Sequence, residues 1–430
     1  MLLLTKGEIF EMTKYSGAVI LLLSLTGLAI ATKPPAKVQY EWKYLNFTWP
    51  SAENHDRSIN DGSYIPENNP IAGIKVWKNQ LYLTIPRWKH GVPATLLTLL
   101  ENEVKLIGEC TGDVSPNVEP FPNWQMQRIG DCSAFQFVQS LEIDPKGRMW
   151  VIDTGRVATL ADKPENNCPA RLVVLDLENN AEVLLDYVFP EEVTRRDTVY
   201  LNDIVLEHED GGWAFITDTD DEYPGIVVFS LKDKKSWKVS HETMKATAAN
   251  FTVKHDGTKV TQPLNVDGIA ISPASAEKRR ILYYSPLSSL EIFAVPTSVL
   301  KRQPSRIDKN VRLLGRKPSQ TDGMMVSADG RLYFGLLADN TVSSWDSRRP
   351  PFWINQKRVF EEDTTLQWPD TFAIDEQGTL WCVSNRLQTF LADSVDTNEV
   401  NYRVLKLDKL PVRSYQYYKD GSAPELPVIA

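Results

Sequence analysis

A phrase that contains an aspartate recurs along the chain and carries its most chemically informative residues. The sequence reads D-G-I-A-I-S from Asp267, D-G-M-M-V-S from Asp322 and D-T-F-A-I-D from Asp370. Carboxylates that a repeat brings together repel one another, so either one of them holds a proton or a cation lies between them. That cation could be an organic amine or a metal, and oxygen ligands without Cys or His favour Ca²⁺ over Zn²⁺. Asp before Gly is also ordinary turn chemistry, in which the carboxylate accepts from its own backbone, and this alternative stays open for each aspartate alone.

The usual catalytic signatures are absent from the sequence. It contains no G-x-S-x-G, no H-E-x-x-H, no phosphate-binding loop and no Cys/His cluster with zinc spacing. The five histidines, at positions 55, 90, 208, 241 and 255, show no metal-ligand spacing, so we expect them to be surface or structural residues. The recurring phrase is therefore the better lead to function.

The phrase belongs to a repeated pair of strand-like runs. A polar turn and a second run follow each copy, namely I-L-Y-Y from Ile281, L-Y-F from Leu332 and L-W-C-V from Leu380. Weaker copies start at Gly73, Gln139 and Asn202. Six copies roughly 50–65 residues apart are typical of radial repetition. Because one small meander cannot bury both of its faces, stacking six around an axis predicts an all-β, six-bladed β-propeller. A β-sandwich and a two-domain β protein are the alternatives, but neither explains why the same phrase returns.

The ring of blades also needs to be closed. Residues 38–49 read V-Q-Y-E-W-K-Y-L-N-F-T-W, with large side chains at Tyr40, Trp42 and Tyr44. This pattern predicts a strand that the N-terminus donates to the last blade, beside residues 402–407, and that removes an open sheet edge. We expect residues 32–430 to form this one propeller.

A propeller places the first strand of each blade along its central channel, and the aligned phrases then form a polar ring at one mouth. The members of this ring are Gln139, Asn202, Asp267, Asp322 and Asp370. Second strands return to the same mouth and bring Arg87, Arg156 and Asn385 toward it. A concave site with convergent polar groups is the first place to expect a ligand, so these eight residues are our candidates for binding it.

The net charge is −9, with acidic and basic residues interspersed. This balance argues against nucleic acids and anionic membrane surfaces as partners. We expect a monomer that binds neither.

The N-terminus has the features of a secretory signal peptide. An apolar run at residues 18–28 follows Lys14 and precedes the A-x-A sequence that ends at Ala31, and a run of this length is too short to span a bilayer. We expect cleavage after Ala31, so that residues 1–31 are removed and the protein is secreted. Two glutamates before Met12 are unusual for such a segment, which makes Met12 an alternative start, and a membrane anchor is the alternative to a signal peptide.

Secretion gives meaning to two glycosylation sequons and to the cysteines. The sequons start at Asn46 and Asn250. An oxidising compartment permits disulfides, and the meander places three of the four cysteines near one face, namely Cys110, Cys132 and Cys168. Their pairing stays open on geometry alone. Cys382 lies inside a second strand of a distant blade, so we expect it to be a buried free thiol.

Several long motifs resemble the insect yellow and major royal jelly protein family. They are Y-I-P-E-N-N-P at 64–70, G-I-K-V-W at 73–77, I-P-R-W-K-H-G-V-P-A-T-L at 85–96, P-F-P-N-W at 120–124, M-W-V-I-D-T-G-R at 149–156, S-Q-T-D-G at 319–323 and W-C-V-S-N-R at 381–386. The resemblance covers about residues 41–407 and is greater to yellow-like, dopachrome-converting members than to the royal jelly storage proteins. It implies a secreted six-bladed propeller. It also places Cys132 and Cys168 in family-like contexts, so we predict a disulfide between them, with Cys110–Cys132 as the alternative. Lys146 stands where many relatives have a cysteine.

The resemblance also implies two kinds of activity, isomerisation of dopachrome or dopaminechrome in the melanin pathway and binding of biogenic amines in the channel. An acidic channel suits a protonated amine. One hypothesis is therefore an isomerase for a catechol-derived quinone, which would need a base to take a carbon-bound proton and an acid to return one. The other is a non-catalytic amine-binding or structural protein of cuticle or eggshell. A calcium-dependent lactone hydrolase is a third interpretation by analogy with other six-bladed enzymes. We expect no cofactor, with Ca²⁺ in the channel as the alternative.

Overall fold

Short runs of β-branched and aromatic residues bounded by Gly, Pro, Asn and Asp form strands, as their composition predicts. The structure is a computed structural model that describes residues 36–100, 115–248, 250–273 and 279–429. The predicted signal peptide and Cys110 lie outside these residues. No helix of the described part of the chain is long and apolar enough to cross a membrane.

The described strands form six four-stranded antiparallel sheets, each a blade. Blade 1 contains β2 Gly73–Trp77, β3 Gln80–Thr84, β4 Leu96–Leu100 and β5 Glu119–Pro120. Blade 2 contains β6 Val138–Ile143, β7 Arg148–Asp153, β8 Arg171–Asp176 and β9 Glu182–Val188. Blade 3 contains β10 Leu201–Glu207, β11 Trp213–Asp218, β12 Gly225–Ser230 and β13 Lys235–Val239. Blade 4 contains β16 Val266–Ile271, β17 Ile281–Pro286, β18 Glu291–Pro296 and β19 Arg312–Arg316. Blade 5 contains β20 Met324–Val326, β21 Arg331–Leu336, β22 Thr341–Asp346 and β23 Lys357–Glu361. Blade 6 contains β24 Trp368–Ile374, β25 Thr379–Asn385, β26 Tyr402–Lys409 and β1 Lys37–Trp42.

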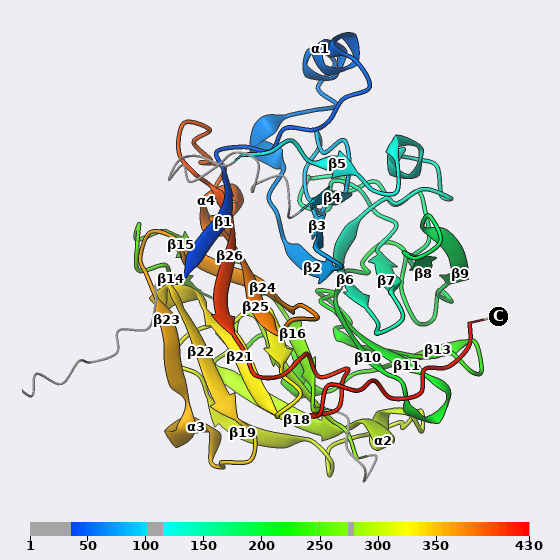
Figure 1. The fold of residues 1–430 in the computed structure, drawn as a ribbon, viewed down its shortest axis with the longest axis vertical. Helices are drawn as coiled ribbons and strands as arrows, with labels where there is room; N and C mark the ends of the chain where they lie inside the picture. Colours follow the sequence, from blue (N-terminus) through cyan, green and yellow to red (C-terminus); the bar gives the residue numbers. More distant parts are fainter. Residues whose placement is uncertain (1–35, 101–114, 249, 274–278, 430) are drawn as a thin grey trace, which may run out of the picture. The chain divides into compact units, whose positions relative to one another are not determined.

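The first strands of the six blades contact one another in a closed ring. The order around the ring is β2, β6, β10, β16, β20, β24 and β2 again, and Figure 1 shows the blades arranged around this centre. The six-bladed propeller predicted from the repeats is confirmed, and the sandwich and two-domain alternatives are not found.

The N-terminal strand closes the ring. β1 pairs with β26 in antiparallel register, with Trp42 opposite Tyr402 and Tyr40 opposite Val404. Tyr40 and Trp42 are buried, so the two large side chains that marked this strand in the sequence hold it to the last blade. The strand ends at Trp42, before the end of the predicted run.

Helices are few and short. They are α1 Ala52–Asn60, α2 Thr297–Leu300, α3 Phe352–Asn355 and α4 Leu387–Leu391, with single 3₁₀ turns η1 Pro66–Asn68, η3 Trp124–Gln127, η4 Glu209–Gly211, η5 Glu242–Met244 and η6 Leu337–Asp339. A small hairpin of β14 Phe251–Thr252 and β15 Lys259–Val260 completes the described elements. The core is made of apolar side chains packed between adjacent blades.

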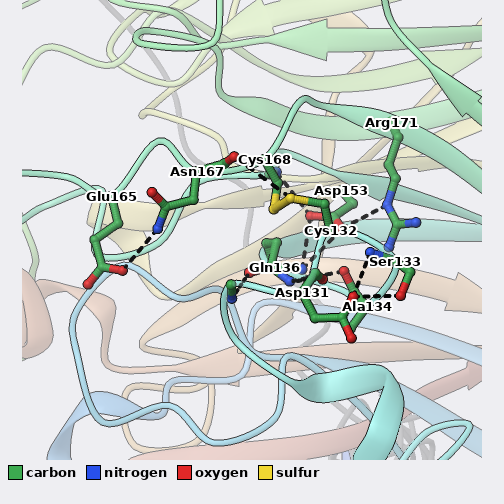
Figure 2. Close-up of a disulfide and its surroundings, with 12 residues drawn as sticks. Asp131, Cys132, Ser133, Ala134, Gln136, Asp153, Glu165, Asn167, Cys168 and Arg171 are labelled. Carbon is green, nitrogen blue, oxygen red and sulfur yellow. Dashed lines mark hydrogen bonds and ion pairs between the residues drawn. A yellow bond between two sulfur atoms is a disulfide. The ribbon is translucent and has the colours of Figure 1, made fainter.

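A disulfide stabilises the loops on one face of the propeller, and the C-terminal segment covers the other face. We call the mouth at which the first strands begin the upper mouth, and the other the lower mouth. Cys132, before β6, and Cys168, before β8, form a disulfide with Cα atoms 5.3 Å apart (Figure 2). The predicted pairing is thus confirmed, and Cys382 is a buried free cysteine as expected.

The C-terminal segment closes the lower mouth. After β26 it crosses this face of the propeller (Figure 1, red), where the Tyr415 backbone nitrogen donates to the Val326 oxygen at 2.9 Å. Gln416 Nε2 donates to the Ile143 oxygen at 2.8 Å, so the segment bonds to blade 5 and blade 2 across the channel. Tyr415 is only 1% exposed and fills the mouth.

Candidate functional site

The structure brings the three aspartates of the recurring phrase together inside the channel. Asp267 lies on β16, Asp322 precedes β20 and Asp370 lies on β24, on three consecutive blades. Their residues are 3%, 6% and 3% exposed, respectively, and the carboxyls of Asp267 and Asp322 share a hydrogen bond. We call these three residues the acid ring.

The glycine of the phrase has a packing role. A Cβ atom on Gly268 would lie 2.1 Å from the Asp322 carbonyl oxygen, and one on Gly323 would lie 2.4 Å from the Asp370 carbonyl oxygen. The Gly323 nitrogen donates to that Asp370 oxygen at 2.7 Å. Only glycine lets neighbouring first strands approach so closely, so the D-G pair combines a channel carboxylate with a contact between blades.

The amides predicted for the ring divide into two that bond the acid ring and one that does not. Asn202 Nδ2 donates to Asp267 Oδ2 at 2.9 Å, and Asn385 Nδ2 donates to Asp370 Oδ2 at 2.6 Å. Gln139 is buried, and among the described residues its Oε1 atom has no hydrogen-bond partner. Trp368, which the sequence analysis did not single out, donates from Nε1 to Asp322 Oδ2 at 2.8 Å.

These surroundings separate the proton affinities of the three carboxyls. Burial raises the pKa of Asp322 to about 6, while the bond from Trp368 acts in the opposite direction. Burial, followed by the charge of Asp322, raises the pKa of Asp267 and of Asp370 well above the ordinary range. Burial and the charge of Asp322 thus favour the protonated forms of Asp267 and Asp370, which would limit the repulsion expected from the sequence.

A second charged layer lies below the acid ring, and unlike the ring it contains a cation, Lys75. Lys75 Nζ lies 3.6 Å from Glu142 Oε2 and donates to the Phe372 oxygen at 3.3 Å. Tyr415 donates from its hydroxyl to Glu142 Oε2 at 3.1 Å. Asp203 accepts from the Ser140 hydroxyl at 2.9 Å. We call Lys75, Glu142, Asp203 and Tyr415 the lower layer; the cavities beside it measure only about 10 and 30 Å³, room for isolated waters at most.

The upper side of the acid ring is covered by aromatic side chains. This aromatic cover consists of Trp88, Phe137, Tyr200, Phe251, Trp368 and Phe390. Trp88 Nε1 donates to the Tyr200 hydroxyl at 2.6 Å. Burial, followed by the charge of Asp267, raises the pKa of Tyr200 well above its ordinary value, so this side chain stays a neutral phenol. Because Asp322 and Asp370 also act on it, Tyr200 lies within electrostatic range of the whole ring.

A cavity of about 320 Å³ opens at the upper mouth beside this cover. Its apolar wall includes Trp88, Tyr200, Leu160, Leu264, Leu387 and Leu391, and its charged wall includes Arg156, Asp197, Asp221 and Glu222. We call this space the upper cavity. Burial, followed by the charge of Asp220, raises the pKa of Asp221. Tyr200 thus lines the cavity and also feels the acid ring, which connects the two.

The two arginines predicted for the mouth occupy different environments. Arg87 is fully buried, and its guanidinium donates to five backbone oxygens, those of Val92, Pro93, Gln127, Phe135 and Gln136. All its donors are used within the fold, so we leave it out of the proposed ligand site. Arg156 donates to Asn166 Oδ1 at 2.8 Å and to the Val199 oxygen at 2.9 Å, and it lines the upper cavity.

The sequence analysis missed the cavity wall and the lower layer. Lys75 places a charge inside the otherwise apolar strand run G-I-K-V-W, and that contrast was a usable signal. Tyr200 and Asp221 carried no comparable signal, because aromatic and acidic residues beside strand ends are ordinary. In the described part of the chain, no three His, Cys, Asp or Glu side chains are placed to hold a metal ion together.

The two sequons are at accessible positions. Asn250 is exposed and Asn46 is partly exposed, and Asn46 Nδ2 donates to Asn117 Oδ1 at 3.2 Å.

The ring of six sheets around a charged channel defines the class of the molecule, a six-bladed β-propeller. The major royal jelly protein family model matches residues 136–412. Protein yellow of Drosophila erecta is 30% identical over 400 residues, which cover 89% of this chain and 71% of that protein. Protein yellow of Drosophila pseudoobscura pseudoobscura is 30% identical over 417 residues, covering 93% and 70%. The chain therefore belongs to the yellow and major royal jelly protein family.

Among solved structures, a luciferin-regenerating enzyme aligns over 85% of this chain and 99% of its own, with 12% identity and a TM-score of 0.48. At that level of likeness nothing about activity transfers.

Proposed function

We propose that the protein is secreted, that it binds a catechol-derived small molecule in the upper cavity, and that it isomerises an aminochrome such as dopachrome or dopaminechrome there. The observation that carries the proposal is the position of Tyr200, which lines the cavity and lies within range of the acid ring. Substrate, donor and acceptor groups can therefore meet at one place without a cofactor.

The cavity wall fits an aromatic ligand with a positive charge. At about 320 Å³ it lies at the small end of small-molecule sites. A catechol ring would pack against the indole of Trp88 and the leucines of the apolar wall. Asp197, Asp221 and Glu222 outnumber Arg156 on the charged wall, so a protonated amine is favoured there.

The acid–base groups suit a tautomerisation. A base takes the carbon-bound proton, the electrons of that bond move into the conjugated ring, and a quinone oxygen takes a proton from an acid. Asp221 borders the cavity and is the base in this proposal. Tyr200 is the acid, because its phenol keeps its proton beside the cavity. One proton is removed and one returned, so the reaction is balanced.

A non-catalytic amine-binding role, in cuticle, eggshell or another extracellular setting, is the second candidate. The excess of carboxylates on the cavity wall supports binding on its own, whether or not turnover follows. Calcium fits less well, because burial raises the pKa of Asp267 and Asp370 and a hard cation needs ionised carboxylates.

Secretion is supported by the cross-link between Cys132 and Cys168. Disulfides persist in oxidising compartments and are rare in the cytosol. The predicted signal peptide at residues 1–31 and the accessible sequons agree with this proposal. N-terminal sequencing of exported material tests it, with Thr32 as the expected first residue and a retained apolar segment in a membrane fraction as the contrary result.

Turnover is tested by the decay of dopachrome followed at its visible absorbance. We expect the purified protein to accelerate it, and Asp221→Asn and Tyr200→Phe each to lower the rate at least tenfold, a typical loss for one acid–base group. Asp420→Asn, an exposed carboxylate on the C-terminal segment, is the matched control. An uncatalysed rate with the wild type rejects the isomerase and leaves the binding role.

Binding is tested by calorimetry with dopamine and serotonin. We expect Asp322→Asn and Asp267→Asn to weaken binding about tenfold, because each removes a carboxyl of the coupled acid ring that would attract a cationic ligand. If neither amine binds the wild type but Ca²⁺ binds tightly, and if Asp→Asn changes abolish that binding, the metal interpretation replaces this one.

A further inference from the structure

A basic and apolar surface lies on the rim of the propeller, far from the chemistry of the channel. It is formed by α3 and by β19, which contact each other at the outer edge of blades 4 and 5 (Figure 1). Trp353 is 64% exposed, Leu313 is 60% exposed and Ile354 is 59% exposed. Among the described large apolar residues only Val428 is more exposed. We call the surface of residues 309–318 and 347–358 the rim patch.

The exposed side chains of the rim patch are held in place from below. Phe352 is 1% exposed, and its ring lies 5.7 Å from that of Phe334 and 5.2 Å from that of Trp345. Because one short helical turn cannot bury three successive large side chains, anchoring Phe352 turns Trp353 and Ile354 outward. A Cβ atom on Gly315 would lie 3.4 Å from the Trp353 Cβ atom, which places β19 directly beside the exposed tip.

Positive charge surrounds this apolar tip. Segment 309–318 holds Lys309, Arg312, Arg316 and Lys317, segment 347–358 holds Arg348, Arg349, Lys357 and Arg358, and neither segment contains an Asp or Glu. All eight except Lys317 are exposed. In the described structure Lys309, Arg312 and Lys357 lie within ion-pair distance of no carboxylate. The other four exposed cations are paired, namely Arg316 with Glu291, Arg348 and Arg349 with Asp346, and Arg358 with Asp339 and Glu361. A chain of net charge −9 has thus concentrated cations around its most exposed aromatic residue.

We infer that the rim patch is a docking surface for an anionic lipid bilayer. A protruding tip of Trp, Ile and Leu flanked by Arg and Lys has the composition of an interfacial anchor, in which the apolar side chains enter the headgroup region and the cations meet lipid phosphates. A bilayer accepts such a tip without a matching pocket, whereas a protein partner needs one. The net charge led us to expect no membrane partner, but that balance averages over the whole surface and conceals this local excess.

Vesicle sedimentation tests the inference with the full-length mature chain. We expect binding to vesicles of phosphatidylcholine with 30% phosphatidylserine, and little binding to phosphatidylcholine alone. Each neutralised cation should weaken binding about fivefold and high salt should reduce it, as expected for electrostatic attraction to a charged surface. Trp353→Ser with Ile354→Ser should weaken binding at least tenfold.

Matched controls separate this surface from non-specific adhesion. Ile129→Ser removes an isoleucine that is 49% exposed elsewhere, and Arg57→Gln removes an exposed arginine of α1; both should bind as the wild type does. All substituted side chains are exposed, so the variants should fold, which far-ultraviolet circular dichroism checks. Absence of sedimentation with anionic vesicles at low salt overturns the inference. That result is the one expected if the patch binds an acidic protein and not a bilayer. Binding that the rim-patch variants leave unchanged overturns it equally.

Discussion

The two halves of the channel both contain buried carboxyls, but in the described structure only the lower half pairs a carboxyl with a cation. The acid ring gathers three carboxyls and no basic side chain, and burial raises the pKa of each of them. The lower layer gathers Glu142 and Asp203 around Lys75 and closes over them with Tyr415. Above the ring there is a cavity of about 320 Å³, whereas the lower layer borders cavities of about 10 and 30 Å³.

The difference separates structure from function within one tunnel. A buried charge that is satisfied inside the fold supports the fold, while groups with raised pKa beside an open cavity are typical of sites that act on a ligand. The lower half thus holds the blades together, whereas polar groups of the upper half are available to interact with a ligand. If this view is right, equivalent substitutions in the two halves should have opposite effects.

The largest expected effect is on the lower layer. Lys75→Met should lower the free energy of unfolding by about 3–5 kcal/mol, because it leaves the buried carboxylates without their cation. Asp322→Asn should leave stability within about 1 kcal/mol of the wild type or raise it, since it removes repulsion. Urea unfolding measures both, with Lys419→Met, at an exposed position, as control. Equal losses of unfolding free energy for Lys75→Met and Asp322→Asn would contradict the distinction between a structural lower half and a functional upper half.

The cross-link of the upper face should have the next largest effect. Cys132 and Cys168 are 36 residues apart in sequence, and a loop of that length predicts a loss of about 3–4 kcal/mol when both become serine. Hydrogen exchange should increase in the upper loops and not in the C-terminal segment. Faster exchange around Tyr415 would show that the two faces are not held independently.

The pH dependence of stability should distinguish the acid ring. The pKa of Asp322 rises from 3.8 to about 6 on folding, so the folded chain holds this proton more tightly than the unfolded chain does. Its contribution to stability is complete below about pH 4 and is lost as the pH rises through about 6. Asp322→Asn should therefore gain stability relative to the wild type between pH 4 and pH 7. Unfolding curves across this range that differ by a constant amount would contradict the raised pKa.

Two tyrosines give the smallest and most selective contrast. Tyr415→Phe removes the bond to Glu142 and the hydroxyl that accepts from the Leu206 nitrogen at 3.0 Å, and it should cost about 1–2 kcal/mol of stability without changing ligand affinity. Tyr200→Phe should weaken amine binding or turnover, and it should cost less stability than Tyr415→Phe because it removes only the bond from Trp88 Nε1. Melting temperatures and calorimetry on the same two variants decide. An exchange of these effects would reverse the roles of the two halves.

Much of the fold followed from the sequence because the repeat is written in it. The D-G phrase marks the first strands of blades 4 and 5, because it combines a carboxyl in the channel with a glycine against the next blade. Tyr40 and Trp42 likewise marked the closing strand. The path of the C-terminal segment was not predictable, because Tyr415 and Gln416 resemble any polar and aromatic tail until the blades they bridge are in place.

The residues of the acid ring could be predicted from the sequence, but those that line the upper cavity mostly could not. Asn202 and Asn385 were found because their repeat positions place them beside the carboxyls that they bond. Arg87 looked equally suitable by position, but its environment of five backbone oxygens depends on loops that no repeat encodes. Asp221 and Tyr200 depend on loop packing for the same reason.

A crystal structure with dopamine bound tests the central claim most directly. The account predicts the ligand in the upper cavity, its ring against Trp88 and Tyr200 and its amine toward Asp221, with the lower layer unchanged. Ligand density in the lower layer, or a cation held by the acid ring with the upper cavity empty, would contradict the claim that the upper half of the channel is the functional one.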